Sequence, residues 1–244
     1  MKRDYTFDVE KVTGDCIQWI KDWFEKNGPG CNAVIGISGG KDSTIVTKLC
    51  VEALGADRVI GVMMPNGVQK DISDSIRVCK LLGINNYTIN IEDAVNSTLN
   101  QMKECGIEIS EQTRTNLPAR IRMSTLYAVS QSNNGRVSNN CNKSEDTMGY
   151  STRYGDAAGD FSPLSELTTV EIVAIGDYLG LPYDLVHKTP IDGLNTNADG
   201  SYVTDEQSMG VSYDDIHKYK FGCYKILKSC NNHKFFLFLL FYFS

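Results

Sequence analysis

Residues 33–43 read AVIGISGGKDS, an apolar run that breaks into a glycine-rich turn. The run 33–37 is short and continuously apolar, as expected of a strand that is buried on both faces. Gly39 and Gly40 follow it, and glycines let a backbone approach an anion closely. Apolar residues then recur at helical spacing as far as residue 54, which indicates a helix directly after the turn. The stretch therefore predicts a strand, a phosphate-binding loop and a helix in succession.

The loop contains the groups that hold a phosphate chain. The free N–H groups of the next helix's first turn, together with its dipole, complete an anion cradle. Ser38 and Ser43 can donate hydroxyl groups, and Asp42 can hold the Mg²⁺ that neutralises phosphate charge. A plain turn, in which the serine and the aspartate only cap the helix, is the simpler alternative. We take Ser38, Lys41 and Asp42 as the catalytic candidates.

Two familiar nucleotide-binding motifs do not fit this loop. A Walker P-loop requires a Gly five positions before its Gly-Lys pair and a Ser or Thr after the Lys. Ile35 and Asp42 stand at those positions instead. The dinucleotide fingerprint G-x-G-x-x-G does not match Gly36, Gly39 and Gly40 either.

Apolar runs and helical patterns also alternate outside this stretch. Such alternation predicts an α/β fold: a doubly wound parallel sheet of the Rossmann-like kind, with helices on both faces. Ligands of such folds bind beyond the carboxyl ends of the strands, where the glycine turn lies. Residues 189–208 are rich in Asn, Asp, Gly and Thr, so we expect a long loop there. Further strands are expected at 58–64, 87–91 and 136–140, and helices at 9–26, 71–82, 94–105, 117–131 and 168–179.

Composition favours one globular domain over residues 1–244, since 41% of the residues are hydrophobic. The net charge of −6 argues against a nucleic-acid partner, because such partners bind basic faces. None of the eight cysteines stands in C-x-x-C spacing, so we interpret them as reduced core thiols of a cytoplasmic protein. No signal peptide is recognised, and the apolar run 235–243 is shorter than the ~20 residues of a membrane span.

The string SGGKDS is identified as the signature of the PP-loop ATP pyrophosphatases, the adenine nucleotide alpha-hydrolase-like superfamily. Within it, the chain resembles the ammonia-dependent NAD synthetases up to about residue 220, with an atypical tail from about 221. Each matching string is short, but their order along the chain separates this family from its PP-loop relatives. They are GISGGKDST (36–44), PNGVQKD (65–71), NLPARIRMSTLY (116–127), CNKSE (141–145), TRYGDAAGDFSPL (152–164), KTP (188–190) and DEQSMGVSYDDI (205–216).

The resemblance implies a reaction in which nicotinic acid adenine dinucleotide (deamido-NAD), ATP and ammonia give NAD, AMP and pyrophosphate through an acyl-adenylate. It also implies ATP as co-substrate, Mg²⁺ as cofactor, and a homodimer, with no membrane or nucleic acid involved. The alternatives are another PP-loop enzyme, such as one that modifies tRNA, and a non-catalytic nucleotide-binding module.

The same resemblance assigns roles to individual residues. Asp42 and Glu145 fall on the family's metal positions. The dinucleotide-contacting residues would be Arg120, Arg153, Asp160, His233 and Lys234. The ATP-contacting residues would be Gly36, Ile37, Ser38, Gly39, Gly40, Lys41, Asp42, Ser43, Asn140 and Thr169.

Some positions depart from the family pattern. Asn140 replaces a Thr that contacts ATP, and Thr169 replaces a Lys that reaches the phosphates. Arg153 stands where many relatives have Lys, which keeps the positive charge. Relatives continue with polar residues after the pair matched by His233 and Lys234, whereas residues 235–243 are apolar here. We therefore expect this tail not to close over the dinucleotide in the usual way.

Overall fold

The computed structural model describes residues 6–196 and 202–220. Four parallel strands form its central sheet, in the order β3-β2-β1-β4. Since all four run the same way, their carboxyl ends meet at one end of the sheet, and the loop after β1 lies there. The strands are β1 (Asn32–Gly36), β2 (Val59–Met63), β3 (Asn85–Thr88) and β4 (Gly135–Val137).

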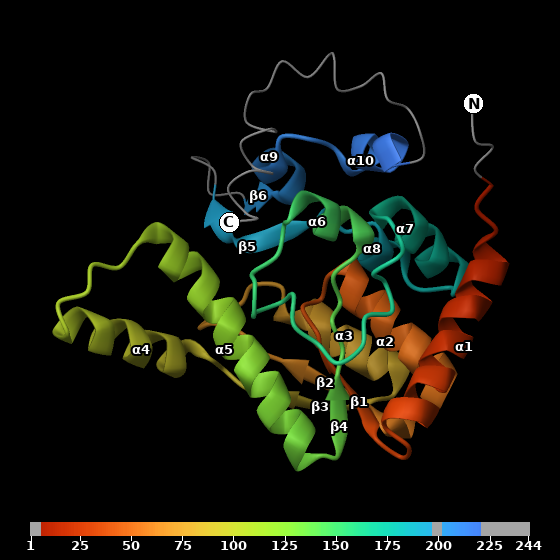
Figure 1. The fold of residues 1–244 in the computed structure, drawn as a ribbon, viewed down its shortest axis with the longest axis horizontal. Coiled ribbons are helices and arrows are strands. Elements are labelled where there is room, and N and C mark those ends of the chain that lie inside the picture. Colours follow the sequence, from red (N-terminus) through yellow and green to blue (C-terminus); the bar gives the residue numbers. More distant parts are fainter. Residues whose placement is uncertain (1–5, 197–201, 221–244) are drawn as a thin grey trace.

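Helices cover both faces of this sheet (Figure 1). One face packs against α1 (Val9–Asn27), α2 (Lys41–Leu54), α3 (Ile72–Leu82) and α7 (Thr169–Tyr178). The other packs against α4 (Glu92–Glu104) and α5 (Glu111–Ser132). The doubly wound α/β fold that the alternating pattern predicts is confirmed.

The central strand β1 divides its side chains between the two cores, as a strand buried on both faces must. Ala33 and Ile35 lie in the core under α1, α2 and α7. Val34 points the other way and lies in the core under α4 and α5. All three are completely buried, which fixes the strand and the loop that follows it.

Two strands lie slightly away from their expected ranges. β3 begins and ends earlier than 87–91, although the N–H groups of Ile89 and Ile91 still donate to the carbonyls of Met63 and Pro65, both at 2.9 Å. Its side chains are exposed, as befits an edge strand, so apolar content was a poor guide to its limits. β4 begins one residue before the expected range 136–140 and ends at Val137, although the Ser138 N–H still donates to the Val34 carbonyl at 2.9 Å.

The expectation of a long loop at 189–208 was wrong. β5 (Ile191–Thr196) and β6 (Tyr202–Thr204) form an antiparallel pair, followed by α9 (Asp205–Met209). A capping box starts α9: Thr204 Oγ1 accepts from the Gln207 N–H, and the Gln207 side chain accepts from the Thr204 N–H. Part of its polar composition therefore reflects helix capping.

Four short helical segments were not expected individually. Each is too short to show a helical period in the sequence. They are η1 (Ala56–Arg58), α6 (Lys143–Met148), α8 (Tyr183–Val186) and α10 (Tyr213–Lys220).

The six cysteines within the described residues are all free. Cys31, Cys50, Cys79 and Cys141 are buried and Cys16 is half-buried, but Cys105 is exposed, so the expectation of a core thiol was wrong for Cys105. Burial raises the pKa of the Cys16 and Cys79 thiols to about 11. Cys223 and Cys230 lie outside the described residues. None of the helices described here combines the length and apolarity that crossing a bilayer takes.

Candidate active site

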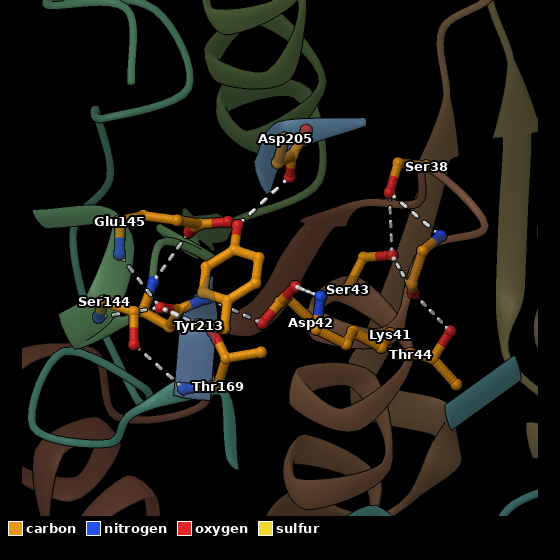
Figure 2. A network of polar contacts seen from close by, with 12 residues as sticks. Ser38, Lys41, Asp42, Ser43, Thr44, Ser144, Glu145, Thr169, Asp205 and Tyr213 are labelled. Atoms are coloured by element: carbon orange, nitrogen blue, oxygen red, sulfur yellow. Dashed lines mark hydrogen bonds and ion pairs between the residues drawn. The ribbon is translucent and has the colours of Figure 1, made fainter. Parts of the chain in front are cut away.

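The glycine turn between β1 and α2 is already folded as a cradle. Ser38 Oγ accepts a hydrogen bond from the Gly40 N–H at 3.2 Å and lies 3.2 Å from Ser43 Oγ (Figure 2). Ser43 Oγ in turn donates to the Gly40 carbonyl at 3.1 Å. Gly39 has a φ of +79°, which a side chain would strain. The backbone of the turn is thereby held at the N-terminus of α2, where N–H groups and dipole favour an anion.

Lys41 and Asp42 open the helix that follows the cradle. The Lys41 side chain is almost fully buried, with 5% of its surface exposed. Its ammonium lies 3.6 Å from Asp42 Oδ2 and 5.3 Å from the centre of the Tyr213 ring. A lysine buried to this degree requires such partners, because burial disfavours a lone charge.

Asn142 links the two predicted metal ligands, and sequence reasoning missed it. Its side-chain amide donates to Asp42 Oδ1 at 3.1 Å, and its backbone N–H donates to Glu145 Oε2 at 3.0 Å. Its own side-chain oxygen caps α6 by accepting from the N–H groups of Ser144 and Glu145. The signal was present in the string CNKSE, since Asn three residues before Glu at a helix start is a capping-box pattern.

Asp42 and Glu145, about a hundred residues apart in sequence, therefore lie close together on either side of Asn142. Burial, and then the charge of Asp42, raises the pKa of Glu145 well above its ordinary value. The nearby Lys41 and the bond from the Asn142 N–H lower that pKa without cancelling the rise. Two adjacent, half-buried carboxylates of this kind form a place that favours a cation.

This pair fits Mg²⁺ by the chemistry of its donors. Mg²⁺ is usually held by one or two carboxylates, with water and substrate phosphates as its other ligands. The described residues contain no cluster of three or more His, Cys, Asp and Glu side chains suited to a metal. The chain instead has two carboxylates beside the phosphate cradle. This arrangement suits an Mg²⁺ ion whose remaining ligands are water and the phosphates of the substrate.

The structure also brings Asn140 and Thr169 to the edge of the cradle. Asn140 Nδ2 donates to the Gly36 carbonyl at 3.1 Å, so this side chain supports the end of β1. The Thr169 N–H donates to Ser144 Oγ at 3.2 Å, and its hydroxyl donates to Asn142 Oδ1 at 3.4 Å. Both residues thus adjoin the expected phosphate site.

A cavity of about 390 Å³ opens beside the cradle, between α7, the segment 186–190 and α10. Lys41, Thr169 and Tyr213 line it, so it meets the phosphate loop directly. Lys188 also lines it, and its ammonium is held at 2.7 Å by both Asp71 and Asp74. The volume of this cavity lies within the range of small-molecule sites.

Two of the residues expected to contact the dinucleotide, Arg120 and Arg153, contact each other. Arg120 Nε donates to the Arg153 carbonyl at 3.3 Å, so these two lie together. The Arg153 guanidinium lies over the Tyr154 ring, 4.9 Å from its centre. Asp160 accepts from the Val137 N–H at 2.7 Å, which ties it to the end of β4. His233 and Lys234 lie outside the described residues.

The fold and this loop define a class. A parallel α/β sheet that carries SGGKDS beyond its first strand is the arrangement of the PP-loop, or adenine nucleotide alpha-hydrolase, proteins. The family model for NAD synthase matches residues 12–229. An NH(3)-dependent NAD(+) synthetase of Thermococcus sibiricus is 36% identical over 208 residues, 85% of this chain and 78% of that protein. The synthetase of the same name from Archaeoglobus fulgidus is 37% identical over 212 residues, 86% of this chain and 82% of that one.

Solved structures of synthetases also resemble this chain. The NMN synthetase of Francisella tularensis superimposes with a TM-score of 0.81 at 30% identity, covering 97% of this chain and 93% of that chain. The NH3-dependent NAD synthetase of Campylobacter jejuni superimposes with a TM-score of 0.69 at 32% identity, covering 75% and 78%. This chain belongs to the NAD synthase family, whose members are ligases that form a C–N bond with ATP as co-substrate.

Proposed function

We propose that this chain amidates nicotinic acid adenine dinucleotide with ammonia, using ATP, to give NAD, AMP and pyrophosphate. The observation that carries the proposal is the meeting of the phosphate cradle with the Asp42–Asn142–Glu145 group, in a chain of this family. A carboxylate resists attack by ammonia, so its oxygen first attacks the α-phosphorus of ATP and pyrophosphate leaves. Ammonia then attacks the acyl carbon, loses a proton, and releases AMP.

In this proposal, different residues bind the phosphates and the metal ion. The cradle of Ser38, Gly39 and Gly40 binds the phosphates through N–H and hydroxyl groups, and Lys41 adds a positive charge. Asp42 and Glu145 would hold Mg²⁺, which when bound neutralises phosphate charge and acts as a Lewis acid. Asn140 and Thr169 would line the site that binds ATP.

A second acceptor deserves a test because the Francisella tularensis structure that covers nearly the whole chain is an NMN synthetase. Its chemistry would be the same, with nicotinic acid mononucleotide as the acid. Pyrophosphate release is measured with ATP, ammonium and each acceptor in turn. We expect the dinucleotide to give the higher kcat/KM. The reverse order would reassign the substrate, and no release with either acceptor would overturn the proposal.

We further propose that Arg120, Arg153 and Asp160 contact the acceptor, and that the chain forms a homodimer in the cytoplasm. The free thiols of the described residues support a reducing compartment. The dimer rests on the family resemblance, and light scattering after size-exclusion chromatography should give twice the chain mass.

Gly39→Ala tests the shape of the cradle. A Cβ at this position would lie 3.0 Å from Ser75 Oγ and 3.1 Å from the Ser75 nitrogen. Backbone strain of this kind costs about 1–3 kcal/mol, so we expect the Kd for ATP to rise roughly 10- to 100-fold. Calorimetric titration measures it. Gly55→Ala is the control, because Gly55 also has a positive φ, +86°, but has nothing near its Cβ and lies away from the cradle. ATP affinity that stays at the wild-type value in Gly39→Ala would count against the cradle.

Arg120→Met tests the acceptor group. An exposed guanidinium that pairs with a phosphate or carboxylate makes charge-assisted bonds, so we expect KM for the dinucleotide to rise about tenfold with KM for ATP unchanged. Arg114→Met is the matched control, since it removes the same charge from an exposed position on the same helix. If both variants raise KM for the dinucleotide equally, Arg120 has no specific role.

A further inference from the structure

The segment formed by α9 and α10 lies over the phosphate cradle and places Tyr213 against it. Figure 2 shows Tyr213 between Asp205 on one side and Lys41 and Asp42 on the other. The tyrosine hydroxyl donates to Asp205 Oδ2 at 3.1 Å. Tyr213 and Asp205 are only 5% and 7% exposed, so this hydrogen bond is shielded from water.

The ring of Tyr213 forms one wall around the Lys41 ammonium. The ammonium lies 5.3 Å from the ring centre, within the range of a cation–π contact. Asp42 Oδ2 lies 3.6 Å away. Such contacts are strongest when the cation is desolvated, as this lysine is. The lysine is thus held between a carboxylate and an aromatic face, at the wall of the cavity that both it and Tyr213 line.

Several independent contacts fix the ring in this place. The Tyr213 N–H donates to Glu206 Oε1 at 2.8 Å, which ties the start of α10 to α9. His217 Nδ1 lies 2.8 Å from Thr168 Oγ1, which docks α10 on the start of α7. Tyr213 also packs with Met148 and Ile216 in a small apolar cluster. Burial, followed by the charge of Glu145, raises the pKa of the phenol, so it stays protonated and donates to Asp205.

We propose that Tyr213 is a positioning residue for the reaction: its ring directs the Lys41 ammonium towards the bound phosphates, and Asp205 holds the ring in place. The proposal rests on the proposed use of ATP. The C-terminal part of the described chain thereby takes part in phosphate binding without touching the nucleotide itself. Neither residue belongs to the phosphate cradle.

The experiment measures the Kd for ATP by calorimetric titration, KM for ATP and for ammonium by kinetics, and Tm for each variant. Tyr213→Leu removes the aromatic face, and we expect the Kd and the KM for ATP to rise about tenfold, with KM for ammonium unchanged. Tyr213→Phe keeps the face and loses the bond to Asp205, so a smaller rise, of about threefold, is expected. Ile216→Ala is the control for docking, because it loosens the same apolar cluster and keeps the aromatic ring that lies beside Lys41. It should lower Tm and leave the Kd for ATP unchanged.

A double-mutant cycle with Lys41→Met decides whether Tyr213 acts through the lysine. We expect the Kd of Lys41→Met/Tyr213→Leu to equal that of Lys41→Met alone. Additive effects, or an Ile216→Ala variant that weakens ATP binding as much as Tyr213→Leu does, would overturn the assignment of Tyr213 while leaving the proposed function standing. Failure of the wild-type protein to bind ATP would overturn both.

Discussion

Asp42→Asn should lower turnover by about two to three orders of magnitude while leaving the fold intact. The substitution preserves shape, and the new amide oxygen can still accept the bond that Asn142 Nδ2 makes to Asp42 Oδ1. What it removes is the negative charge beside the phosphate cradle, one of the two charges available to hold Mg²⁺. The rate of pyrophosphate release at saturating ATP, across a range of Mg²⁺ concentrations, measures the loss.

The same substitution should not destabilise the metal-free protein. The charge of Asp42 contributes to raising the pKa of Glu145, so above the ordinary pKa of a glutamate the folded protein pays for ionising both groups. Removing one charge relieves this repulsion, and at neutral pH the Tm of Asp42→Asn should equal or exceed that of the wild type. Asp57→Asn, at an exposed position in η1, is the control for a neutralised carboxylate elsewhere. Near-native turnover of Asp42→Asn at limiting Mg²⁺ would remove Asp42 from the site.

The second large effect concerns the source of nitrogen: ammonium should support the reaction, and glutamine should give no rate above background. Releasing ammonia from glutamine requires an activated nucleophile. Burial raises the pKa of Cys16 and Cys79 to about 11, so these thiols are protonated and unreactive at neutral pH. Comparing the initial rates of NAD formation with either donor tests this on the 244-residue chain.

The pH dependence gives this prediction a second readout. Ammonia is the nucleophile and ammonium is not, so at fixed total ammonium the rate should rise with pH towards the ammonium pKa. Expressed per free ammonia, kcat/KM should stay flat over the same range. Glutamine supporting a comparable rate, with protein shown free of contaminating glutaminase, would refute the prediction.

The strand, turn and helix that make up the cradle could be predicted from local sequence, because they follow one another directly along the chain. The buried run 33–37, the glycine turn and the start of α2 are joined by short-range geometry that residue types dictate. The strands β1 and β2 could be predicted for the same reason, since each carries its own apolar signal. The exposed edge strand β3 lacks that signal, and its limits were misjudged.

The rest of the site depends on contacts between distant segments, which no local pattern records. Asn142 reaches Asp42 across a hundred residues, and Tyr213 reaches Lys41 from the far end of the described chain. The positions of Glu145 and Arg120 were expected from family resemblance, and spacing alone did not single them out. The polar stretch 189–208 looked like a loop because capping residues and turn residues share the same composition.

The most direct test of the account follows the oxygen of the substrate carboxylate. Nicotinic acid adenine dinucleotide is labelled with heavy oxygen in the carboxylate and incubated with the chain, ATP and ammonium. The masses of the products are then measured by mass spectrometry. If the carboxylate attacks the α-phosphorus, each turnover gives one NAD, one pyrophosphate and one AMP, and one carboxylate oxygen appears in the AMP phosphate. Heavy oxygen in pyrophosphate or in free phosphate, or AMP formed without NAD, would contradict the account.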